Sequence, residues 1–106
     1  MPHYMFRASY SREGLQGVLK EGAASRIDVV RKLAESVGGS VEVAYWAFGE
    51  HDFVTIMELP DNAAAAAAAS AVAASGVGSI STTVLLTAAD VDEARARRPA
   101  YRAPGA

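Results

Sequence analysis

The chain contains no cysteine, which excludes disulfide bonds, thiol nucleophiles and zinc sites built on cysteine. Charged residues are few and almost balanced: 10 basic and 12 acidic side chains give a net charge of −2. This balance argues against the basic surface by which proteins bind nucleic acids. No apolar run reaches the roughly 18 residues of a membrane span, and the first residues lack the basic start and apolar core of a signal peptide. We therefore expect a cytoplasmic protein without nucleic-acid or membrane partners.

The composition is that of a small globular domain. Hydrophobic residues make up 51% of the 106-residue chain and charged residues 21%. We expect one domain over residues 1–98, followed by a flexible tail over residues 99–106 that is rich in proline, glycine and alanine. A chain this short buries only about 60–70% of the surface of its unfolded state, so contact with a second copy would add stability.

Hydrophobic periodicity and turn residues divide the chain into alternating elements. Strands are expected over residues 3–10, 41–48, 52–59 and 79–87. Helices are expected over residues 11–22, 25–37, 62–75 and 88–98. This order predicts an α+β protein with the ferredoxin-like split βαβ arrangement (β-α-β-β-α-β) and a C-terminal helix.

Residues at the helix starts and in the third helix support this division. The expected N-caps are Ser25, which has Asp28 three positions later, Asp61 or Asn62, and Thr87, which has Asp90 three positions later. The third helix contains seven consecutive alanines, from Ala63 to Ala69. Alanine combines the highest helix propensity with a small side chain, so we expect this helix to pack close to the sheet through one face.

The expected strands are apolar on both of their faces. Their apolar members include Tyr4, Met5, Phe6, Val43, Phe53, Ile56, Val84 and Leu86. Helices on one side of a ferredoxin-like sheet leave its other face bare, and a bare apolar face must be covered. We expect a homodimer or larger oligomer joined through this face, with a cavity between subunits or between the sheet and its helices.

The turn between the second and third expected strands carries a motif. It consists of Gly49-Glu50-His51-Asp52-Phe53-Val54 followed by Ile56-Met57-Glu58-Leu59-Pro60-Asp61. The motif resembles the signature of the GYD-domain family, and the similarity extends over residues 3 to 90 through Tyr4, Tyr10, Gly14, Ser25, Arg26, Ser81 and Thr82. The resemblance implies a ferredoxin-like fold of the dimeric α/β-barrel type. It implies no mechanism, because the biochemical role of the family is poorly defined.

Two residues depart from the family pattern. His51 stands where a tyrosine is usual, and Arg7 stands in a first strand that is usually apolar. A buried charge is costly unless it is paired, so Arg7 is the first candidate for a site that holds a carboxylate or another oxyanion. The alternative is an ion pair with Glu42 or Glu58, or a side chain that extends along the surface to water.

Arg7, His51 and Glu58 are the catalytic candidates. Histidine titrates near neutral pH and suits general acid–base chemistry, and a carboxylate at a strand end, such as Glu58, could act as a base. The alternatives are structural: His51 would be exposed in its turn, and Glu58 would pair with an arginine.

Aromatic side chains supply the remaining ligand-binding candidates. Tyr10, Tyr45 and Trp46, together with Arg7, could hold a planar ligand by stacking. Tyr45 and Trp46 are adjacent, so they face opposite sides of their strand and only one of them can reach a given cavity. The alternative for all three is ordinary packing.

The sequence favours binding over chemistry. Its serines lack an evident His/Asp partner set, and two histidines as far apart as His3 and His51 predict no metal site; we expect no cofactor. The first hypothesis is a small-molecule-binding oligomer with a ligand cavity at the sheet face. The alternative is a cofactor-free enzyme, such as an oxygenase, isomerase or cyclase of small aromatic or polyketide-like substrates. Convergence of Arg7, His51 and either Tyr45 or Trp46 on one pocket would favour the enzyme.

Overall fold

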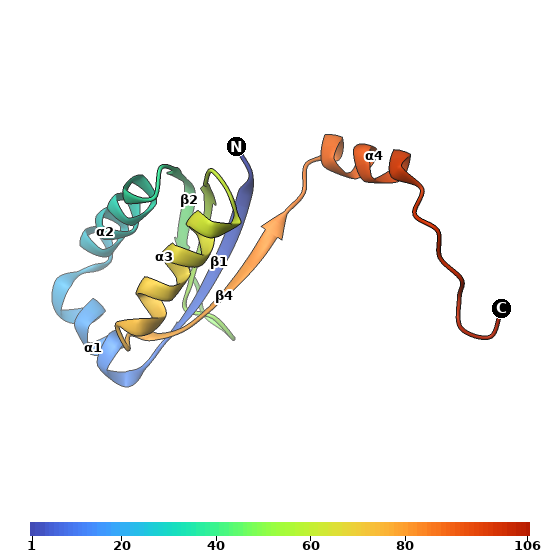
Figure 1. Ribbon diagram of the computed structural model, residues 1–106. Helices are drawn as coiled ribbons and strands as arrows, with labels where there is room; N and C mark the ends of the chain where they lie inside the picture. The colour runs from blue at the N-terminus through green and yellow to red at the C-terminus, as the bar shows by residue number, and fades with distance from the viewer.

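A computed structural model describes all 106 residues and contains four strands and four helices (Figure 1). The strands are β1 (His3–Tyr10), β2 (Ser40–Trp46), β3 (Phe53–Glu58) and β4 (Gly78–Leu85). The helices are α1 (Arg12–Glu21), α2 (Ala23–Ser36), α3 (Asn62–Ala74) and α4 (Ala88–Arg97). The strands form one antiparallel sheet in the order β2-β3-β1-β4. The predicted ferredoxin-like fold with a C-terminal helix is thereby confirmed.

One face of the sheet is covered by α2 and α3 (Figure 1). The hydrophobic core lies between the sheet and these helices and consists of Tyr4, Phe6, Ala34, Met57, Leu59 and Ala65. Side chains alternate along a strand, so the residues between these core positions point to the other face. We call that second surface the open face, because no helix of the chain covers it. The dimeric barrel that would cover it stays a prediction.

The alanine-rich helix α3 packs through one side, as its composition predicts. Ala65 and Ala68 are only 3% and 2% exposed, and Ala64 and Ala69 are partly buried. Their spacing is that of one face of an α-helix. Asp61 is the N-cap of α3 and accepts a hydrogen bond from the backbone N–H of Ala64 at 2.9 Å, so the expected cap is confirmed.

The predicted N-cap at Ser25 is wrong. Helix α2 begins at Ala23, directly after Gly22, and its N-cap has no side-chain hydrogen bond. Gly22 has φ of 101°, which other residues rarely adopt, and this lets α1 end and α2 begin without a linker. The Ser25 hydroxyl instead donates to Glu21 at 3.2 Å.

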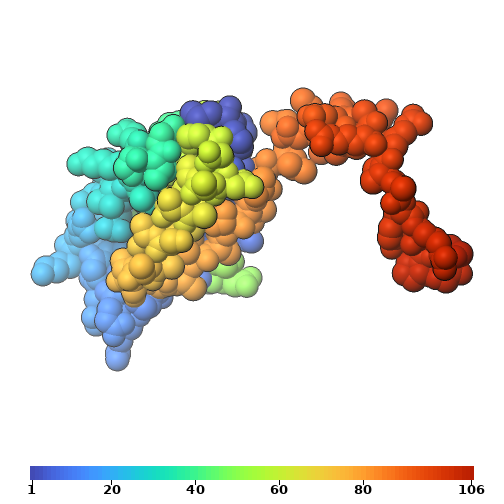
Figure 2. All heavy atoms as spheres, in the orientation of Figure 1, coloured from blue at the N-terminus to red at the C-terminus, as the bar shows by residue number.

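Helix α4 and the residues after it project away from the sheet as an arm (Figures 1 and 2). No residue of α4 is buried, and the longest dimension of the molecule is 57 Å. The radius of gyration is 16.8 Å, against about 13 Å for a compact domain of this length. Thr87 caps α4 in the predicted capping box with Asp90. None of the four helices has the length and apolar character required to cross a membrane.

Candidate functional site

The two sheet faces separate the candidate residues. Tyr10 and Trp46 point to the helix side, where their rings stack at 5.8 Å. Arg7 and Tyr45 lie on the open face, opposite Val54 on their respective sides of β3, and Tyr45 is 68% exposed. The alternation of strand side chains thus prevents the predicted candidates from meeting in one pocket.

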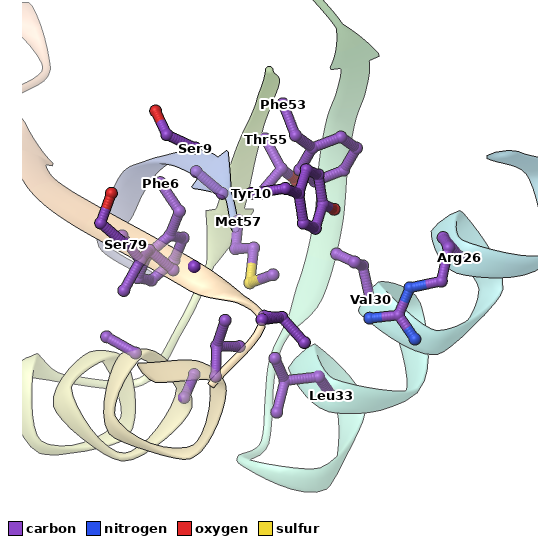
Figure 3. A pocket seen from close by; sticks show the side chains of 17 residues that line it. Phe6, Ser9, Tyr10, Arg26, Val30, Leu33, Phe53, Thr55, Met57 and Ser79 are labelled. Atoms are coloured by element: carbon purple, nitrogen blue, oxygen red, sulfur yellow. The ribbon is translucent and has the colours of Figure 1, made fainter. Parts of the chain in front are cut away.

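A cavity lies between the sheet and helices α2 and α3 (Figure 3). Its volume is about 60 Å³, and 12 of its 17 lining residues are hydrophobic. The wall includes Phe6, Phe53 and Met57 from the sheet, Val30 and Leu33 from α2, and Ala68, Ala69 and Val72 from α3. The small side chains of α3 leave this space between helix and sheet.

Tyr10 and Arg26 line the cavity among these apolar residues, together with the smaller polar side chains of Ser9, Thr55 and Ser79 (Figure 3). Burial raises the pKa of the Tyr10 hydroxyl, and the Arg26 guanidinium opposes this shift while the Asp52 carboxylate adds to it. Tyr10 is therefore a neutral hydrogen-bond donor at pH 7. Arg26 is partly buried and lies only 3.5 Å from Glu21. Arg26 and Tyr10 thus give the largely apolar cavity one cationic and one phenolic group.

Arg26 is the site residue that sequence reasoning missed. It marks part of the family resemblance at the start of α2, but the resemblance assigns it no role. Val30 and Leu33 follow it by four and seven positions, so all three share one face of α2. An arginine in register with the apolar face of its helix is the signal that could have identified it.

Trp46 supports the wall of the cavity from behind. Its ring contacts Tyr10 on one side and Phe53 on the other, with a centroid distance of 5.0 Å to Phe53. Trp46 itself does not line the cavity, and its indole N–H is buried without a hydrogen-bond partner. Of these two aromatic candidates, Tyr10 lines the cavity, whereas Trp46 contributes packing that holds Tyr10 in position.

The family motif fastens the β2–β3 turn to strand β1. Asp52 accepts a hydrogen bond from the backbone N–H of Tyr10 at 2.8 Å and donates its own N–H to the carbonyl of Ala8 at 2.8 Å. His51 is partly buried, and its Nδ1 lies 3.3 Å from the Ser9 hydroxyl. That hydroxyl donates to the carbonyl of Glu50 at 2.9 Å. The motif is therefore structural here, and His51 does not line the cavity.

The carboxylates predicted to pair with arginine contact His3 instead. Nδ1 of His3 is 2.6 Å from Glu42, and Nε2 is 3.7 Å from Glu58. His3 lies directly opposite Glu58 in the β1–β3 register, which explains the pairing. The three side chains could also supply ligands to a metal ion, a grouping that sequence analysis did not expect. Each ring nitrogen already faces one carboxylate, so this arrangement suits a doubly paired histidine.

Arg7 makes no ion pair within the chain, so the predicted contact with Glu42 or Glu58 is wrong for an isolated subunit. Arg7 is partly buried, and its Nε atom is fully enclosed without a hydrogen-bond partner. The register places Arg7 opposite Val54, four residues from His3 along β1. His3 occupies the position from which both carboxylates are reached.

Of the catalytic candidates, Arg7, His51 and Glu58, none lines the cavity. The chain matches the GYD domain family over residues 4–94. No curated protein and no solved structure matches it. Because the match spans most of the sequence and the turn motif, the four strands and their order agree with it, the chain belongs to the GYD domain family.

Proposed function

We propose that the protein is a homo-oligomer that binds a small molecule in the cavity between the sheet and helices α2 and α3. The observation that carries this proposal is an apolar cavity lined by one guanidinium and one neutral phenol. The apolar part of the ligand packs against Phe53 and Met57. Its acidic group, a carboxylate or an equivalent oxyanion, is held by Arg26 and Tyr10.

The electrostatics of Arg26 favour an anionic ligand. Charge-assisted hydrogen bonds from guanidinium to carboxylate are about twice as strong as neutral ones. Glu21 is the carboxylate of the chain that pairs with Arg26, and at 3.5 Å this contact is loose and partly exposed to water. A ligand carboxylate at the cavity can displace it and gain a second hydrogen bond from the Tyr10 hydroxyl.

The size of the cavity restricts the ligand. A volume of about 60 Å³ exceeds the room that one water needs, but it is smaller than the roughly 150 Å³ cavity that accepts benzene. The ligand therefore inserts only an apolar end, or the surrounding side chains shift to admit a ring. We expect a compact amphipathic acid such as an aryl or short branched carboxylate.

The second part of the proposal, self-association, is supported by the open face. This surface carries Met5, Val43, Val54 and Ile56, which lie on the neighbouring strands β1, β2 and β3. Burial of such side chains contributes about 25 cal/mol per Å² of apolar area. A second copy of the chain would remove them from water.

Benzoate is a suitable probe of the cavity, because it joins a planar apolar ring to a carboxylate. Titration into the isotopically labelled protein, followed by amide chemical shifts, should move resonances of β1, α2 and α3 around the cavity. Arg26→Gln should weaken binding about tenfold or more, since it removes a charge-assisted contact of the ~1.5–3 kcal/mol class. Arg31→Gln, at an exposed position of the same helix, is the matched control.

A second pair of variants tests the location. Ala68→Val adds two methyl groups to the cavity wall, whereas Ala67→Val adds them to the exposed side of α3. Both carry the same cost in helix propensity. Loss of benzoate binding in the first variant alone supports the cavity. Equal binding in both, or shifts confined to the open face, would refute it.

A further inference from the structure

The open face carries charge in a self-complementary order along the strands. At one end, His3 and Glu58 lie opposite each other and Glu42 contacts the same histidine. The next β1 residue on the same face is Met5, which lies opposite Ile56. The following position on this face is Arg7, which lies opposite Ser81 of β4. The face therefore has an acidic end, an apolar middle and a cationic position.

The charges of this face are not satisfied within one chain. Arg7 is partly buried, and its Nε is enclosed without a partner; an enclosed donor that lacks a hydrogen bond is unfavourable. At the acidic end, two carboxylates share a single histidine, and they remain about 41% and 39% exposed. Each end of the face thus lacks the charge that the other end carries.

Of two-fold axes that run parallel or perpendicular to the strands, only the perpendicular one brings these ends together. An axis parallel to the strands would place Arg7 near the partner's Arg7, which is repulsive. An axis perpendicular to the strands at the level of Met5 reverses the strand direction of the second copy. Arg7 then lies opposite the partner's His3 and near the partner's Glu58. Because the interface is isologous, the same contact occurs twice.

The dimensions permit this contact. Arg7 follows His3 by four positions, which is about 13 Å along a strand at 3.3 Å per residue. The axis at Met5 lies midway, so the two levels coincide after rotation. Sheets that pack face to face lie about 10 Å apart, a gap that an extended arginine and a glutamate can bridge together. The apolar middle packs against its own copy.

We propose that two copies of the chain pair through their open faces with antiparallel β1 strands, and that Arg7 of each copy forms an ion pair with the Glu58–Glu42 cluster of the other. This inference rests on the self-association in the proposed function. It adds the orientation of the subunits and the residues that fix it. It also assigns a partner to the guanidinium that the single chain leaves unpaired.

Charge reversal tests the pairing directly. Arg7→Glu and Glu58→Arg should each weaken dimerisation at least tenfold, because each variant sets like charges against each other across the interface. An equimolar mixture of the two variants should form a heterodimer free of both repulsions, because the two reversed side chains face each other and so do the two native ones. Native mass spectrometry separates the heterodimer from both homodimers by mass, and sedimentation equilibrium gives the dissociation constants.

Variants Arg31→Glu and Glu35→Arg make the same charge changes on the exposed side of α2 and should leave dimerisation unchanged. A wild-type dimer that neither reversal weakens, or a mixture with no preference for the heterodimer, would overturn the ion pair while leaving self-association and the cavity intact. If the wild-type protein is still a monomer at 100 times the concentration used in the sedimentation experiment, both the ion pair and self-association are overturned. Benzoate binding in the cavity is tested separately by its own titration.

Discussion

The two faces of the sheet differ in the charge of the polar groups that they enclose. On the helix side, Tyr4 is 1% exposed, and its hydroxyl donates to Asn62 at 2.7 Å. Thr55 is 2% exposed, and its hydroxyl donates to the Val43 carbonyl at 2.8 Å. Each face also encloses one N–H donor without a partner, the indole N–H of Trp46 on the helix side and the Nε of Arg7 on the open face. The two donors differ in charge: the indole is neutral, whereas Arg7 is a cation, and an unpaired cation costs more free energy than an unpaired neutral N–H. The open face therefore has the greater need of a partner.

The largest expected difference in unfolding free energy is between the loss of an aromatic side chain on the helix side and the loss of one on the open face. Phe6→Ala on the helix side should lower the free energy of unfolding by about 3–5 kcal/mol, because it leaves a cavity in the core. Tyr45→Ala on the open face should lower it by less than about 1 kcal/mol in the monomer, and instead weaken self-association. Urea unfolding at a concentration below the dimer dissociation constant measures both free energies. Equal losses would abolish the distinction between the faces.

A glycine of α1 sharpens the account of the covered side. A Cβ on Gly14 would collide with the carbonyl group of Val77, which is backbone and cannot move aside. Gly14→Ala should therefore destabilise the protein by about 3 kcal/mol, at the upper end of the overpacking range. Gly17→Ala lies on the same helix in open space and should stabilise it by about 0.4–1 kcal/mol. Thermal unfolding that shows the same sign for both variants would contradict this close approach.

The alanine helix provides a third comparison within one element. Ala65→Leu adds volume between α3 and the sheet and should cost about 1–3 kcal/mol. Ala66→Leu, at an exposed position, should cost less than about 0.5 kcal/mol. A leucine scan from Ala63 to Ala69, measured by urea unfolding, should thus follow the helical period. Uniform tolerance would show that α3 is loosely docked.

The smallest effect lies in α4, which belongs to neither face. Hydrogen bonds to the backbone and side chain of Thr87 lower the pKa of Asp90 below its ordinary value. A carboxyl group with a lowered pKa in the folded state stabilises that state above its unfolded pKa, and this stabilisation is lost as the pH falls through the folded pKa. The helical carbon shifts of α4 should therefore decrease in acid before the sheet unfolds. Asp90→Ala should remove this pH dependence, whereas Asp92→Ala should retain it.

Local signals predicted most of the elements and their order. Asp61, Thr87 and the glycines after the helices acted as the caps and breaks that their chemistry suggests. The prediction at Ser25 failed because Gly22, with its positive φ, started α2 two residues earlier. A potential cap is used only where the preceding backbone leaves the helix start open, and the single sequence does not show that.

The site was harder to predict because it depends on which side chains of neighbouring strands lie on the same face of the sheet. An irregularity between Val41 and Val43 shifts the register of β2 against β3. Val41 therefore packs against the core, and Tyr45 points to the open face. Strict alternation from Val41 would have put both residues on one face. The spacing of Arg26, Val30 and Leu33 places Arg26 on the apolar face of α2, but only the docking of α2 on the sheet brings that face to the cavity.

The sequence by itself determined the secondary structure, the fold class and the family, since caps, turns and hydrophobic periods act over a few residues. Tertiary structure decided which candidates meet. His3, rather than Arg7, contacts Glu42 and Glu58, because His3 lies opposite Glu58 in the β1–β3 register. Contacts between residues 39 and 55 positions apart, such as those of His3 with Glu42 and Glu58, depend on register and face, and a single sequence carries neither directly.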